Sequence, residues 1–129
     1  MQIRSFRDLR VWQAGIDLVR AIYEATSRFP RNETYGLASQ MQRAAVSVPS
    51  NIAEGHARES TKEYLQHLSI AQASLAELET QLEIAKLLSY ISEADANSLL
   101  ETIAALGRQL FALRNALMNP KARTASPGS

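Results

Sequence analysis

Hydrophobic residues recur every three or four positions in four separate stretches of the chain. This spacing places apolar side chains on one face of an α-helix, whereas a β-strand would show strict alternation. The pattern predicts helices over about residues 6–29, 33–56, 60–89 and 92–118. The clearest apolar seam lies in the third helix and comprises Tyr64, Leu68, Ala71, Leu75, Leu78, Leu82 and Ala85.

The first helix carries two neighbouring apolar stripes instead of one. The first stripe contains Leu9, Trp12, Ile16, Val19, Tyr23 and Thr26, and the second contains Val11, Leu18, Ile22, Ala25 and Phe29. Short connections between the four helices force consecutive helices to run antiparallel. The expected fold is therefore all-α, an antiparallel up-down-up-down four-helix bundle that forms one domain over residues 1–118. Residues 119–129 contain no apolar anchor and are expected to form a disordered tail.

The second helix lacks the charges that a solvent-facing helix carries. Residues 34–53 contain one charged residue, Arg43. Val46 and Ala53 lie nearly opposite the apolar seam when the segment is plotted at about 100° per residue. A helix without a charged side is usually covered all round, and three neighbouring helices cannot do that. We therefore expect a second copy of the chain to cover this side, through Val46 and Ala53.

Pro49 lies in the middle of this second helix. Proline removes one backbone hydrogen bond and crowds the carbonyl four residues earlier, so it kinks or breaks a helix. A kink would let the helix follow a curved oligomer surface, and this is the preferred interpretation. The alternative is that the helix ends at Val48 and a short helix resumes near Ser50.

A polar ladder flanks the apolar face of the second helix. Its members step by three or four residues and are Gln40, Arg43, Ser47, Asn51 and Glu54. One interpretation is a hydrogen-bonded network across the bundle or a subunit interface, because buried polar networks are commonly structural. The other interpretation is a ligand site. The network is the preferred interpretation.

Composition excludes several classes of chemistry. The 129 residues contain no cysteine, which excludes disulfides, thiol catalysis and cysteine-based zinc sites. The chain has no glycine-rich phosphate loop and no serine nucleophile elbow. His67 and Glu63 are four residues apart, but two potential ligands without a third make a weak metal site. We expect no enzyme activity, no metal and no cofactor.

Charge is distributed unevenly, although the net charge is only +1. Residues 54–101 are acidic overall, while residues 102–129 contain four basic residues and no acidic one. Near the N-terminus, Arg4, Arg7 and Arg10 form a basic run that is a candidate nucleic-acid contact. Repetition of this run in an oligomer would increase the affinity through avidity. The alternative is that these arginines are ordinary solvated surface residues.

Three stretches also resemble a known family: FRDLRVWQ at 6–13, YGLASQMQRAAVSVPSNIAEGHAR at 35–58 and EYLQHLSIAQASLAELETQL at 63–82. They are similar to the four-helix-bundle proteins encoded in intervening sequences of bacterial 23S ribosomal RNA genes. The resemblance covers about residues 5–118, and its most specific part is SVPSNIAEG at 47–55. It implies a homopentamer with a central channel. It also implies similarity to the accessory proteins of diversity-generating retroelements, which bind a reverse transcriptase and nucleic acid.

Two functions remain open from these observations. The first is a non-catalytic oligomeric adaptor that binds RNA or DNA, or a nucleic-acid enzyme such as a reverse transcriptase. The second is a purely protein-binding structural oligomer whose acidic middle contacts a basic partner. No segment combines a basic start with an apolar run, and no run is long enough to cross a bilayer, so we expect a cytoplasmic protein without membrane contact.

Overall fold

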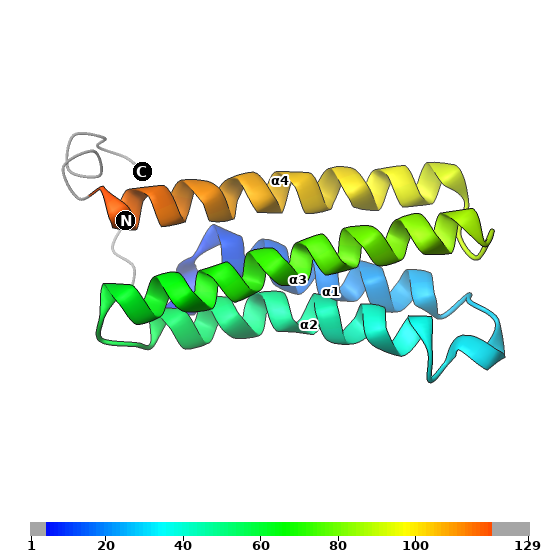
Figure 1. The fold of residues 1–129 in the computed structure, drawn as a ribbon, viewed down its shortest axis with the longest axis horizontal. Coiled ribbons are helices and arrows are strands. Elements are labelled where there is room, and N and C mark those ends of the chain that lie inside the picture. The colour runs from blue at the N-terminus through cyan, green and yellow to red at the C-terminus, as the bar shows by residue number, and fades with distance from the viewer. Residues whose placement is uncertain (1–4, 120–129) are drawn as a thin grey trace.

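The computed structural model describes residues 5–119 and consists of four long helices joined by short connections (Figure 1). The helices are α1 (Arg10–Thr26), α2 (Leu37–His56), α3 (Thr61–Leu87) and α4 (Glu93–Met118). A short 3-10 helix, η1 (Phe6–Asp8), precedes α1, and a second one, η2 (Arg31–Glu33), precedes α2. The chain runs up and down in turn, which confirms the predicted four-helix bundle. The predicted disordered tail lies outside the described residues, apart from Asn119.

Serine side chains mark where helical segments begin, as the sequence indicates. The Ser60 hydroxyl accepts a hydrogen bond from the Glu63 amide at 3.1 Å, and Ser92 caps α4 in the same way through Asp95. These bonds satisfy backbone amides that have no partner inside the helix. Ser5 forms a full capping box, but on η1, so α1 itself begins only at Arg10.

The predicted helix boundaries are wrong by three or four residues at three places: the start of the first helix, which is Arg10 and not residue 6, and both sides of the connection between α1 and α2. The first helix ends at Thr26 and not at residue 29, and the second begins at Leu37 and not at residue 33. Phe29 nevertheless stays buried, where its ring packs against Tyr90 from the α3–α4 connection. An aromatic side chain can thus remain in the core while the backbone around it has left the helix.

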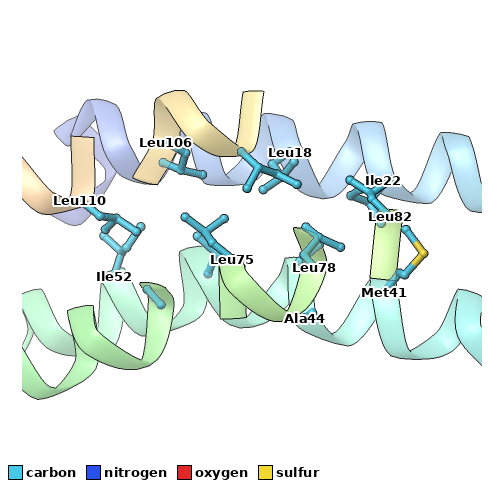
Figure 2. Close-up of a cluster of buried hydrophobic side chains, with 14 of the residues drawn as sticks. Leu18, Ile22, Met41, Ala44, Ile52, Leu75, Leu78, Leu82, Leu106 and Leu110 are labelled. Atoms are coloured by element: carbon cyan, nitrogen blue, oxygen red, sulfur yellow. The ribbon is translucent and has the colours of Figure 1, made fainter. Parts of the chain in front are cut away.

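The core runs along the bundle axis and is made of aliphatic side chains from all four helices (Figure 2). Of the two stripes on α1, the second is the buried one: Val11, Leu18, Ile22, Ala25 and Phe29. In the first stripe, Ile16 and Tyr23 remain exposed. The seam of α3 is buried as predicted from Leu68 to Ala85, whereas Tyr64 at its start is half-buried.

α2 passes through Pro49 as one helix from Leu37 to His56. A break after Val48 is therefore wrong, and the kink at Pro49 stays a prediction. Pro49 is buried and packs against Gly15 of α1. A Cβ atom built on Gly15 would lie only 3.2 Å from the Pro49 Cβ, which shows how close the two residues are. The Gly15 position has no side chain of its own, so the proline ring can fill the space between the two helices.

Candidate functional site

The outer side of α1 and α2 carries exposed apolar side chains. Ile16 and Tyr23 on α1 are 39% and 47% exposed, and Val46 on α2 is 40% exposed. Ala53 lies on the same side of α2 and is half-buried. We call these four residues the α1–α2 outer face. The sequence placed Val46 and Ala53 there, but it assigned Ile16 and Tyr23 to a seam of α1.

The two helices share a hollow on this face. Its lining consists of Tyr23, Ser39, Gln42, Arg43, Val46 and Ser47. The Gln42 side chain donates a hydrogen bond to the Thr26 hydroxyl at 3.0 Å, which ties α2 to the last turn of α1. Arg43 is the one charged residue in this lining, and the other lining residues are apolar or neutral polar. Such a surface suits burial against another protein better than contact with water alone.

The middle of the polar ladder forms hydrogen bonds between α2 and α3. The Ser74 hydroxyl donates to the Ser47 hydroxyl at 2.8 Å. The Asn51 amide nitrogen donates to the Ser47 hydroxyl at 3.0 Å, and the Asn51 oxygen lies 3.0 Å from His67 Nδ1. Ser47 and Asn51 thus link α2 to α3 within one chain.

The two ends of the ladder behave differently. The Glu54 carboxylate lies 3.6 Å from His67 Nδ1 and is largely exposed, so it lengthens the network toward solvent. Gln40 and Arg43 are exposed and make no side-chain hydrogen bond or ion pair within residues 5–119. These two side chains are available to a partner, whereas Ser47 and Asn51 are already occupied.

Gly55 allows α2 and α3 to approach each other closely. A Cβ atom at this position would lie 2.9 Å from the Cβ of His67 and 2.9 Å from Cδ1 of Tyr64. Real side chains essentially never approach that closely, so any other residue would push the helices apart. The same packing raises the pKa of the Tyr64 phenol through burial. SVPSNIAEG thus contains a proline that contacts α1, a polar pair that contacts α3 and a glycine for close approach.

η1 and the start of α1, which carry Arg7 and Arg10, lie at the end of the bundle that also holds the α2–α3 connection and the end of α4 (Figure 1). Arg4 is outside the described residues. Arg7 and Arg10 are both exposed. The Arg7 guanidinium lies 5.6 Å from the centre of the Phe6 ring and 5.8 Å from the Trp12 ring, so it makes cation–π contacts. Arg7 therefore has a structural contact that the sequence did not reveal, while Arg10 is solvated.

The histidines do not assemble a metal site. His67 turns toward Asn51 and Glu54 on α2, away from a pairing with Glu63, and the His56 ring packs edge-on against Tyr64. No group of three His, Asp or Glu residues in the described part of the chain could hold a metal ion. Across residues 5–119, none of the helices is both long and apolar enough to span a membrane.

A family model and a solved structure each match most of this chain. A family model described as the 23S rRNA-intervening sequence protein matches residues 7–112. Among solved structures, the chain is similar to a protein of unknown function from the S23 ribosomal protein family of Bacteroides thetaiotaomicron VPI-5482, with 20% identity and a TM-score of 0.73. The match covers 81% of this chain and 97% of that one, and at this identity it shows a shared fold. Among curated proteins, none matches.

Proposed function

Because the chain belongs to the 23S rRNA-intervening sequence protein family, we propose that it is a non-catalytic, homo-oligomeric adaptor for nucleic acid or a nucleic-acid enzyme. A homopentamer is the proposed assembly, and a reverse transcriptase is the proposed class of enzyme partner. Both rest on the family resemblance of the SVPSNIAEG region, which implies a homopentamer and a likeness to retroelement accessory proteins.

The α1–α2 outer face is the observation that carries this proposal. Three apolar side chains from two helices are exposed together, and residues 34–53 have only Arg43 as a charge. Exposed apolar surface next to a hollow with a single charged residue is typical of a protein interface. A second copy of the chain would bury this surface and would give Gln40 and Arg43 partners.

Glutamate substitution tests the assembly. Val46→Glu and Ala53→Glu should each dissociate the oligomer, because each buries an unpaired charge at the proposed contact. Ala94→Glu is the matched control, since Ala94 is exposed in the first turn of α4, a helix that packs beside α1 and α3 but not beside α2. Light scattering after size exclusion measures the mass. Unchanged mass in both the Val46 and Ala53 variants would refute this interface.

Charge reversal tests nucleic-acid binding. Anisotropy of labelled RNA and DNA, single- and double-stranded, is titrated at several salt concentrations with wild-type protein and with Arg4→Glu/Arg7→Glu/Arg10→Glu. Binding should fall steeply with salt and be abolished in the triple variant, because phosphate contacts release counterions. Arg20→Glu/Arg28→Glu/Arg31→Glu is the control of equal net charge. Undiminished binding by the first triple variant would exclude the N-terminal basic run.

The alternative function is a structural oligomer that binds only protein. The observation that favours it is three exposed acidic side chains on α3, Glu77, Glu79 and Glu83, of which Glu83 lies 3.5 Å from Lys86. Exposed carboxylates suit a basic protein partner and oppose a phosphate backbone. The same titration separates the two functions, since wild-type protein that binds no nucleic acid at low salt would support the protein-only oligomer.

A further inference from the structure

The second half of α4 presents an aromatic ring between two arginines. Phe111 is 64% exposed, although phenylalanine is normally a core residue. Arg108 and Arg114 lie three residues before and after it, so all three side chains project from neighbouring turns of the helix. Met118 lies seven residues further along and is 56% exposed.

Acidic residues are absent from the second half of α4 and from the part of α3 beside it. The last acidic residue of the chain is Glu101, and residues 102–129 contain none. Two contacts show which part of α3 lies beside this half of α4. Arg114 donates a hydrogen bond to Gln72, and a Cβ atom built on Gly107 would lie 4.0 Å from Cδ1 of Leu75. Residues 64–76, which hold both α3 positions, contain no acidic residue either. Anions therefore meet no repulsion from these two helical segments.

One observation argues that Arg108 does more than balance the helix dipole. A cation interacts with the dipole only within the last turn of a helix, and Arg108 is exposed about three turns from Met118. Arg114 is half-buried, and its guanidinium donates a hydrogen bond to Gln72 on α3. Its Nε atom is enclosed by the protein, so only its terminal amino groups could reach a phosphate.

We propose that this surface binds single-stranded nucleic acid, with Phe111 as a stacking platform for one base and Arg108 and Arg114 as phosphate contacts. Proteins that bind single strands combine a positively charged surface with aromatic rings on which bases stack. Duplex bases are already stacked on each other, so the ring can serve only an open strand. This inference rests on the nucleic-acid part of the proposed function and names the form of nucleic acid that is bound.

The position of the surface supports the same ligand. The end of α4 lies at the end of the bundle that holds η1, with Arg7, and the start of α1, with Arg10 (Figure 1). A strand that contacts Arg108 and Phe111 could therefore continue toward the N-terminal arginines. The acidic residues of α4, which are Glu93, Asp95 and Glu101, all lie in its first half, toward the opposite end.

Substitution of the ring separates stacking from packing. Phe111→Leu keeps an apolar side chain but removes the aromatic face, and it should weaken binding of a labelled single-stranded 20-mer about tenfold. Phe111→Trp should bind at least as well as wild type, because it restores the aromatic face. Arg108→Gln should lower the slope of log affinity against log salt by about one phosphate. Arg20→Gln is its control, since Arg20 is an exposed arginine on α1.

The outcomes separate failure of the α4 surface from failure of the proposed nucleic-acid function. Wild-type binding that is equal in Phe111→Leu and Arg108→Gln would overturn the α4 surface and leave the N-terminal run as the contact. Equal competition by single strands and duplex would also overturn the stacking role. A lower oligomer mass in Phe111→Leu would make Phe111 a subunit contact instead. Absence of any wild-type binding at low salt would overturn both the α4 surface and the nucleic-acid function.

Discussion

The contact between α2 and α3 and the attachment of α4 use different kinds of packing. α2 and α3 each bury eight residues, and several of these are small or polar, such as Gly55 on α2 and Ser74 on α3. α4 buries four residues, three of which are Ile103, Leu106 and Leu110, and it leaves Phe111 and Met118 exposed. Specific packing thus fixes α2 against α3, whereas α4 is held by a simpler aliphatic seam and keeps more surface available to a ligand.

Truncation of a leucine in each region should show the largest difference. Leu78 is fully buried on α3, so Leu78→Ala should lower the free energy of unfolding by about 3 kcal/mol. Leu113 on α4 is only partly buried, and Leu113→Ala should cost roughly 1 kcal/mol. Urea denaturation measures both. Equal losses would mean that α4 is packed as tightly as α3.

Addition of one methyl group should have opposite signs in the two regions. Gly55→Ala should destabilise the fold by about 2 kcal/mol, because the new Cβ overlaps His67 and Tyr64. Gly107→Ala on α4 meets only Leu75 at 4.0 Å, so it should stabilise the fold by up to about 1 kcal/mol through helix propensity. Thermal denaturation followed by circular dichroism compares them, and a stabilising Gly55→Ala would contradict the close approach of α2 and α3.

Removal of one hydroxyl from the α2–α3 network should have a smaller effect. Ser74→Ala deletes the buried hydroxyl that donates to the half-buried Ser47 hydroxyl and should cost about 1 kcal/mol. Ser69→Ala is the matched control, since Ser69 is exposed on the same helix. Urea denaturation gives the free energy of unfolding of each variant, and the difference between the two values measures the Ser74–Ser47 hydrogen bond. Equal free energies would mean that this bond contributes no more to stability than an exposed serine hydroxyl does.

Glu33 provides the smallest effect, and it depends on pH. Its carboxylate accepts hydrogen bonds from the Leu37 amide at 3.1 Å and the Tyr90 hydroxyl at 2.8 Å, which lower its pKa below 4.5. A lowered folded-state pKa gives stability above pH 4.5 that is lost as the pH falls through the lowered value. Wild type should therefore exceed Glu33→Gln in urea stability at pH 7, and the difference should shrink at pH 3. A difference that does not change with pH would contradict this role.

The four helices could be predicted from the sequence, because helical periodicity depends only on spacing along one chain. The choice between the two stripes of α1 could not, since both have helical spacing and only the positions of α2 and α4 decide which is buried. The partners of Ser47 and Asn51 were also out of reach, because the pairing with Ser74 and His67 requires the register between α2 and α3. Arg108 and Phe111 left a sequence signal, the absence of acidic residues after Glu101.

Native mass spectrometry of the purified full chain tests the central claim, that a second copy covers the α1–α2 outer face. The proposal predicts a mass that is a multiple of the 14.2 kDa chain, with five copies as the expected assembly, and a monomer for Val46→Glu. A wild-type protein that remains monomeric at micromolar concentration would contradict the claim and would leave Ile16, Tyr23 and Val46 exposed for a different partner.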